Sequence, residues 1–252
     1  MNKIDVVILA GAKAGPDLMP GAENTSRAMM DLGGKPMIQW VVDAIRGCEQ
    51  VGRIAVVGEV TGSGIDVVVN PGPNLVSNIY LGVEALGVSG RVLVVCADVP
   101  LLTSEAVDDF VNRALKIEAV LAYPVIPRSQ CEAKYPGLKR TYLRTADGVF
   151  TGGNLVMVDA DFLRSNGVII ERAYAARKHV SKLARMIGVG ILLRVVLGQI
   201  FPRLLTLSTL ERAAGRLVNA PVAAIVSDYP EIGEDIDKPS DVESVRKILA
   251  AK

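Results

Sequence analysis

The stretch IDVVILAG, residues 4–11, is almost continuously apolar, is rich in β-branched side chains and ends at a glycine. A strand with one face in water alternates apolar and polar residues, whereas a continuous apolar run is typical of a strand buried on both faces. Such strands occur mainly in parallel sheets that helices cover on both sides. The start of the chain therefore predicts an α/β fold.

Strand and helix patterns alternate after this first run. Pro36 opens a helical pattern whose apolar face reaches Ile45, because proline is tolerated in the first turn of a helix. Further strands are predicted at 54–57, 65–69, 92–96 and 118–125, and further helices at 76–86 and 103–116. This order predicts a layered α/β fold with a mainly parallel sheet, whose ligands bind at the carboxyl ends of the strands.

The pattern changes to mixed α+β beyond Pro127. A turn-rich basic stretch leads into a predicted hairpin around residues 146–148, and strands are predicted at 154–158 and 222–226. Pro239 opens a last helix that reaches about Leu249.

The segment 182–207 is the most apolar part of the chain. Its longest uncharged stretch, Met186 to Leu193, is far shorter than the roughly 18 apolar residues of a membrane-spanning helix. We expect a buried helix or a homodimer face through residues 183–207, and favour either over contact with a membrane surface.

Composition excludes several classes of protein. The 252 residues include 28 Lys and Arg against 27 Asp and Glu, with 4% aromatic residues, which disfavours nucleic-acid binding. Three widely spaced cysteines and one histidine suit neither a disulfide framework nor a zinc site, so a metal ion would be bound by oxygen. The apolar run at the N-terminus meets glycines and a lysine rather than a cleavage site, and we predict a cytoplasmic protein.

The loop GAKAG, residues 11–15, follows the first strand where the chain turns over the edge of the sheet. Backbone amides in such a loop can bind phosphate, with Lys13 as an added charge, although the glycines could serve only the turn. The loop is neither a P-loop nor a Gly-x-Gly-x-x-Gly fingerprint, which argues against an NAD-dependent oxidoreductase.

Two acidic positions are candidates for chemistry. Asp98 directly follows a buried strand, and Pro100-Leu101-Leu102 separates it from the next helix, which disfavours a capping role. The run EDIDKP, residues 234–239, precedes a helix, and taken alone its acids are best explained by stabilisation of that helix. Paired with Asp98 across a crevice, Asp237 would complete an oxygen-only Mg²⁺ site.

Basic residues supply the opposite charge. Arg27 and Lys35 lie near the first helix and could bind an anion. A second group lies in the turn-rich stretch, and we interpret it as a solvated hairpin face; it comprises Arg128, Lys134, Lys139, Arg140 and Arg144.

Four blocks together, VILAG (7–11), RAMMDLGGKPMI (27–38), DVPL (98–101) and DIDKPSD (235–241), resemble the MobA-like nucleotidyltransferases of the nucleotide-diphospho-sugar transferase superfamily. The resemblance covers residues 4–125 well, and 150–158 and 222–250 more loosely. It implies a three-layer α/β/α sandwich with a Rossmann-like, mainly parallel sheet. Residues 1–252 would form one domain, with a nucleotide-binding half (1–125) and an acceptor-binding half (126–252) that contains an apolar helical insertion at about 168–217.

The resemblance implies Mg²⁺-dependent transfer of a nucleoside monophosphate from a nucleoside triphosphate to a small phosphorylated or hydroxyl acceptor, with release of pyrophosphate. Mg²⁺ would be held by Asp98 and Asp237, with Asp235 as the near competitor. The expected catalytic residues are Arg27, Lys35 and Asp98. Nucleotide contacts are expected at Leu9, Ala10, Gly11, Ala12, Lys13, Arg27, Asn70, Ser77, Asn78 and Asp98. Acceptor contacts are expected at Gly152, Gly153 and Asn154, where the glycines would let the acceptor approach the backbone.

The chain departs from the family pattern in three ways. Ala12 replaces the last glycine of the usual Leu-Ala-Gly-Gly, the arginine and glycine that normally follow this motif have no clear counterpart, and Arg27 stands where the family usually has a lysine. Residues 13–26 look like an inserted loop. A catalytically silent nucleotide-binding or scaffold protein is therefore an alternative, and the basic residues ahead of the apolar segment make a peripheral membrane protein another.

Overall fold

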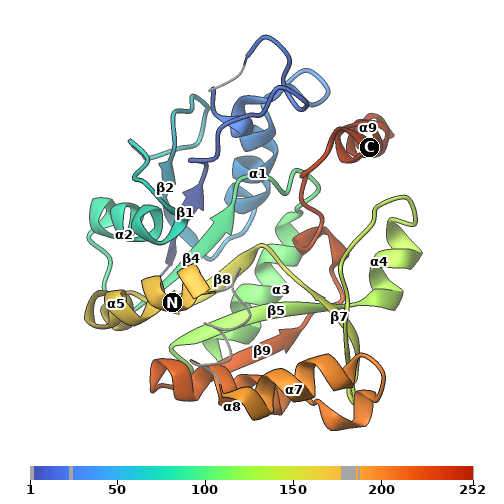
Figure 1. Cartoon of the computed structure of the whole chain (residues 1–252). Helices are drawn as coiled ribbons and strands as arrows, with labels where there is room; N and C mark the ends of the chain where they lie inside the picture. Colours follow the sequence, from blue (N-terminus) through green and yellow to red (C-terminus); the bar gives the residue numbers. More distant parts are fainter. Residues whose placement is uncertain (1–2, 23–24, 177–185, 187, 252) are drawn as a thin grey trace.

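The computed structural model describes residues 3–22, 25–176, 186 and 188–251 (Figure 1). The strands are β1 (Ile4–Leu9), β2 (Val51–Val57), β3 (Val67–Val69), β4 (Arg91–Cys96), β5 (Leu121–Pro127), β6 (Leu143–Thr145), β7 (Gly148–Gly152), β8 (Leu155–Asp159) and β9 (Val222–Val226). The helices are α1 (Met37–Arg46), α2 (Leu75–Leu86), α3 (Ser104–Leu115), α4 (Arg128–Lys134), α5 (Ala160–Ala176), α7 (Val189–Gly198), α8 (Leu207–Val218) and α9 (Pro239–Ala250). Short 3-10 turns are η1 (Arg27–Met29), η2 (Pro202–Leu204) and η3 (Pro230–Ile232).

Within these residues, nine strands form one sheet in the order β3-β2-β1-β4-β8-β5-β7-β6, and β9 pairs with β5. The pairs β3-β2, β2-β1, β1-β4 and β5-β9 are parallel. Strand β8 runs antiparallel between β4 and β5, so these two strands point in the same direction. The predicted hairpin is confirmed, because Thr145 pairs with Gly148 at the turn between β6 and β7.

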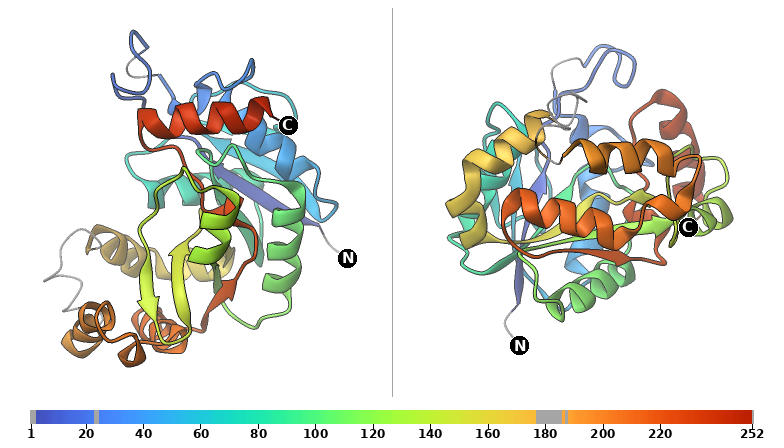
Figure 2. Two further views of the ribbon diagram at one scale, coloured as in Figure 1. Left: turned by 90° about the vertical axis from the view of Figure 1, so that its right-hand side faces the viewer. Right: turned by 60° about the horizontal axis from the view of Figure 1, so that its bottom comes forward.

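Helices cover both faces of the sheet, which confirms the predicted α/β fold (Figures 1 and 2). On one face, Val6 and Ile8 of β1 pack in a core with side chains of α1 and α3. On the other face, Val7 packs in a second core with α2 and α5. Because successive side chains of a strand point to opposite faces, this explains why β1 is apolar at nearly every position.

Several predicted elements differ from the structure. Helix α4 lies within the stretch predicted as turns, and the strand predicted at 118–125 is β5 at 121–127. Strand β3 has only three residues, since the Asp66 carboxylate ahead of it accepts a hydrogen bond from the Ile54 amide (2.7 Å) and pairs with Arg46.

Helix α7 lies at the surface with exposed apolar side chains, so its interpretation as a buried helix is wrong. The rest of the apolar segment before Gly188, apart from Met186, lies outside the described residues. Among the described helices, none combines the length and apolar character that crossing a bilayer requires.

The contact of α2 with the sheet depends on a glycine. A Cβ at Gly82 would lie 2.3 Å from Cγ1 of Val7, closer than any real contact, whereas Gly190 of α7 has open space at the same atom. We expect Gly82→Ala to lower the free energy of unfolding by about 1–3 kcal/mol through overpacking. Gly190→Ala should leave it unchanged or raise it by up to about 1 kcal/mol, because alanine favours the helix. Urea denaturation of both variants distinguishes the two effects, and equal losses would contradict the packing argument.

Candidate functional site

The candidate site lies where β1 and β4 end. These strands are parallel neighbours, and Leu9 is in register with Cys96. The Ala97 amide donates to the Leu9 carbonyl (3.1 Å), after which the two chains separate. Loop 10–15 and Asp98 therefore leave the sheet side by side at its carboxyl edge, where α/β sheets bind ligands.

A first cavity of about 280 Å³ opens at this edge. The structure brings seven of the predicted nucleotide-binding residues to its wall, namely Leu9, Ala10, Gly11, Ala12, Arg27, Asn78 and Asp98. A Cβ at position 11 would lie 2.6 Å from Nδ2 of Asn78, so a larger residue there would have to displace the Asn78 side chain. This close approach places the first loop against the start of α2, whose N-cap is Asn74.

Four other predicted residues lie elsewhere. Lys13 pairs with Glu59 (2.6 Å) and does not line the cavity. Lys35 pairs with Asp43 (2.5 Å), and its ammonium lies 3.7 Å from the centre of the Trp40 ring. Ser77 is engaged in the capping box of α2, where its hydroxyl accepts from the Asn74 amide. Asn70 is exposed after β3.

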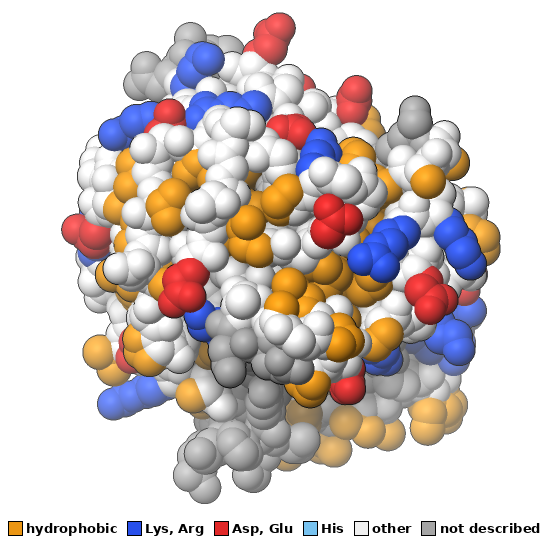
Figure 3. Space-filling view, turned by 90° about the horizontal axis from the view of Figure 1, so that it is seen from above, with side chains coloured by type: hydrophobic (Ala, Val, Ile, Leu, Met, Phe, Trp, Pro, Cys, Tyr) orange, Lys and Arg blue, Asp and Glu red, His pale blue; other side chains and the backbone are white. Residues whose placement is uncertain are grey.

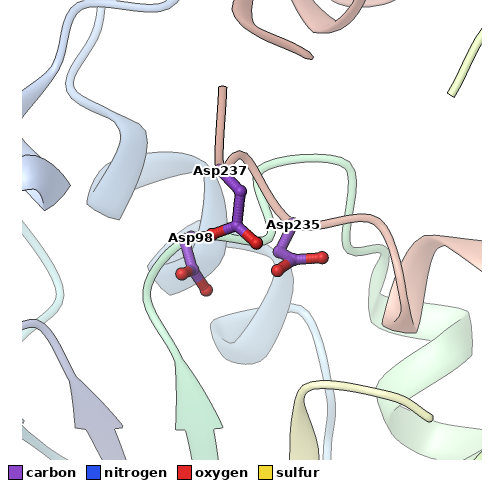
Figure 4. A group of neighbouring side chains, drawn as sticks. All are labelled: Asp98, Asp235 and Asp237. Carbon is purple, nitrogen blue, oxygen red and sulfur yellow. The ribbon is translucent and has the colours of Figure 1, made fainter. Parts of the chain in front are cut away.

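Three carboxylates converge beside the first cavity. One oxygen each of Asp98, Asp235 and Asp237 lies within 4.8 Å of the others (Figure 4). Asp98 follows β4, whereas the other two come from the loop between η3 and α9. The buried Ile236 fixes this loop, because its amide donates to the Asp98 carbonyl (3.0 Å). The sequence singled out Asp98 and Asp237 and treated Asp235 as a competitor, but all three side chains gather at one place.

Two arginines compensate the charge of this acidic group, which we define as Asp98, Asp235 and Asp237. Arg27 pairs with Asp98 and lies 3.3 Å from Asp237, and Arg140 pairs with Asp235. Burial raises the pKa of the Asp98 carboxyl to about 6, although Arg27 acts in the opposite direction. Asp98 Oδ1 is buried and has no hydrogen-bond partner among the described residues.

The donor set suits a hard divalent cation. Such ions prefer carboxylate oxygens and complete their coordination with water and substrate phosphate. The acidic group offers three carboxylates in reach of one another, and Oδ1 of Asp98 is a buried acceptor without a donor. A magnesium ion would therefore fit these residues better than a soft or nitrogen-preferring metal ion would.

A second cavity of about 380 Å³ lies on the other side of the acidic group. Its wall includes Asp235 and Asp237 together with the basic residues Lys139, Arg140 and Lys238. The interpretation of Arg140 as part of a solvated hairpin face is wrong, because its side chain is only 15% exposed. No local signal could have identified Arg140, since its partner Asp235 lies 95 positions further along the chain.

Of the other basic residues in that stretch, Lys134 also has a structural partner. Its ammonium binds the carboxylate of Glu231 (2.9 Å), whose side chain is 1% exposed. The contact ties α4 to η3, directly ahead of the loop that carries Asp235 and Asp237.

The glycines expected at the acceptor serve protein packing instead. A Cβ at Gly152 would lie 2.4 Å from the Tyr123 hydroxyl oxygen, and one at Gly153 would lie 2.6 Å from Cγ2 of Ile232. These glycines therefore have a packing role in the structure, and acceptor contacts at Gly152 and Gly153 stay a prediction. Asn154 is half-buried, and its Nδ2 donates to the Gly233 carbonyl at 3.5 Å. Thr151, which directly precedes Gly152, lines the second cavity.

Comparisons with known proteins identify the family and the fold. The family described as MobA-like NTP transferase domain matches residues 6–197. A solved structure described as a hypothetical transferase from Thermus thermophilus is 34% identical, with a TM-score of 0.85, and the match covers 95% of this chain and 99% of that one. No curated protein matches the sequence.

Two further solved structures are similar in fold. One is CMP:2-keto-3-deoxy-manno-octonic acid synthetase complexed with CTP, which is 15% identical with a TM-score of 0.60, over 100% of this chain and 99% of that one. The other is 2-C-methyl-D-erythritol 4-phosphate cytidylyltransferase, also from Thermus thermophilus, which is 18% identical with a TM-score of 0.55, over 98% and 99%.

Proposed function

Because this chain belongs to the family of MobA-like NTP transferase domains and is thus an enzyme that transfers a nucleotidyl group, we propose that it moves a nucleoside monophosphate from a triphosphate to a small phosphorylated or hydroxyl acceptor, in a Mg²⁺-dependent reaction. The observation that carries this proposal is the position of the acidic group. Asp98 lines the first cavity, while Asp235 and Asp237 line the second. Donor and acceptor would then meet at the carboxylates.

We assign the two substrates to different cavities. We assign the nucleotide to the first cavity and therefore to the half formed by residues 1–125, which contributes nearly all of its wall. The acceptor is assigned to the second cavity, whose wall comes from residues 137–241. The wall carries four carboxylates, Glu234, Asp235, Asp237 and Asp241, and Arg140 is paired with Asp235. Lys139 and Lys238 are the basic groups that would bind an anionic acceptor such as a phosphate ester.

The reaction requires no protein nucleophile. An anionic phosphate oxygen of the acceptor, or a hydroxyl oxygen that gives its proton to water, attacks the α-phosphorus in line. The new bond to phosphorus forms as the bond to the bridging oxygen breaks, and pyrophosphate leaves with that electron pair. When bound, Mg²⁺ would be held by Asp98, Asp235 and Asp237 and would neutralise charge on the reacting phosphate. Arg27, Gly11 and Ala12 line the same cavity, and the Arg27 guanidinium and the amides of the two loop residues would stabilise the charge that grows on pyrophosphate. Arg140 holds Asp235 in place.

A pyrophosphate-release assay tests this function. The full chain is incubated with Mg²⁺, each of the common nucleoside triphosphates in turn, and a panel of sugar phosphates and polyol phosphates. We expect release with at least one triphosphate, dependent on an acceptor and abolished by a chelator. A protein that binds nucleotide yet releases no pyrophosphate with any acceptor would instead support the catalytically silent alternative.

A further inference from the structure

Helix α7 and the turn after it present an apolar surface to solvent. Seven large apolar side chains here are between 42% and 69% exposed, namely Val189, Leu193, Val196, Leu197, Ile200, Phe201 and Leu204. Five of them, Val189 to Ile200, follow the spacing i, i+4, i+7, i+8, i+11, which marks one side of a helix. This spacing normally faces a protein core, whereas here it faces outward. We call these seven side chains the α7 surface.

Charge distinguishes the α7 surface from the rest of the molecule. Arg194 and Arg203 are exposed within it. The described residues 188–210 contain these two arginines and no Asp or Glu. The α7 surface therefore lies in a stretch of net positive charge.

Two acidic side chains near α7 bind backbone amides, and neither forms an ion pair with Arg194 or Arg203 among the described residues. Asp147 accepts a hydrogen bond from the Leu207 amide (2.7 Å), and Glu211 accepts one from the Ala224 amide (2.7 Å). By contrast, the face drawn in Figure 3 mixes side chains of both charge signs with apolar ones. The α7 surface therefore combines exposed apolar side chains with two arginines, Arg194 and Arg203, that form no ion pair among the described residues.

These features select one occupant for the surface. In a symmetric dimer the same patch faces itself, so two positive segments would meet. An anionic lipid surface accepts both properties at once, because apolar side chains enter the boundary of head groups and acyl chains while arginines bind the charged head groups. We propose that the α7 surface docks this protein on membranes that contain anionic lipids, with α7 lying in the plane of the interface.

The orientation leaves the candidate site accessible. In Figure 1, α7 lies at the bottom of the molecule, while α9, which follows the acidic group in sequence, lies near the top. Figure 2, right, shows α7 on the side that comes forward when the bottom of the molecule is turned toward the viewer. This proposal does not depend on the reaction, and its test uses neither nucleotide nor metal.

Vesicle sedimentation of the full chain tests the proposal. We expect the protein to pellet with phosphatidylcholine vesicles in which about a third of the lipid is phosphatidylserine, and to stay in the supernatant with phosphatidylcholine alone. Leu193→Glu and Arg194→Glu should each lower the partition coefficient about tenfold. Raising the salt concentration should weaken binding, because it screens the head-group charge.

The matched control is Val68→Glu, which places the same charge on an exposed valine (52%) of edge strand β3. It should bind anionic vesicles like the original chain, and all variants should keep the thermal unfolding midpoint of the original. Equal losses for Val68→Glu and Leu193→Glu, or no pelleting with anionic vesicles, would overturn the proposal. A dimer in light scattering that Leu193→Glu splits into monomers would assign the α7 surface to a second copy and overturn it as well.

Discussion

Asp98→Asn is expected to lower the rate of pyrophosphate release by about 10²–10³-fold, because a cation that stabilises charge on the reacting phosphate is worth several kcal/mol. The substitution keeps the size of the side chain but removes its negative charge. Asp98 is the member of the acidic group that lines the first cavity, and its buried Oδ1 has no donor among the described residues. Steady-state kinetics at saturating Mg²⁺ measures the loss.

The control for this prediction is Asp109→Asn. Asp109 pairs with Arg113 within helix α3, outside both cavities, so its loss should leave the rate unchanged. The backbone carbonyl of Asp98 still accepts from Ile236 in the Asn variant, and we therefore expect a normal fold by circular dichroism. Turnover of Asp98→Asn at the rate of the original chain would contradict the role of this carboxylate.

Arg27→Met is expected to have the second largest effect, a loss of about 10²-fold in turnover. Arg27 is the basic residue in the wall of the first cavity, to which we assign the triphosphate. Removing a preorganised donor to developing charge typically costs this much. The variant also leaves Asp98 and Asp237 without the cation that now compensates them.

Arg27→Lys separates charge from geometry. Lysine supplies a point charge in place of a planar fork, and it is the residue that the family usually has at this position. We expect it to recover a substantial part of the turnover lost in Arg27→Met, with a larger residual effect on KM than on kcat. If both variants turned over like the original chain, Arg27 would have no role beyond its ion pairs.

The sequence predicted the first half of the fold well for a simple physical reason. Strands buried on both faces leave a nearly unbroken apolar signal, and β1 and β4 carry it. The same signal places Asp98 at a strand end. Helix α2 was predicted within one residue of its start, and its cap Asn74 satisfies the first turn.

The acceptor side could not be predicted, because it is built from contacts between distant parts of the chain. In the sequence, Arg140 is one of several basic residues in a turn-rich stretch. Its ion pair with Asp235 forms only when the chain folds. Likewise, the sequence suggests that a ligand could approach the backbone at Gly153. In the structure the side chain of Ile232 packs against this glycine. The catalytic role of Lys35 remains a prediction that its contact with Asp43 does not support.

In the apolar segment, the spacing of apolar residues predicts a helix but not its surroundings. The spacing of Val189, Leu193 and Val196 is that of a helix with one apolar side, and it says nothing about what that side contacts. The structure supplies the missing fact, since all three side chains are more than half exposed.

The central claim is that Asp98, Asp235 and Asp237 bind a divalent cation next to a nucleotide. Thermal unfolding of the full chain with a nucleoside triphosphate and Mg²⁺, separately and together, tests it most directly, because a ligand raises the midpoint only if it binds the folded state. We predict that the combination raises the midpoint by more than the two separate shifts together, and that Asp98→Asn loses this excess. An equal excess in Asp98→Asn, or a shift by nucleotide that Mg²⁺ does not change, would contradict the account.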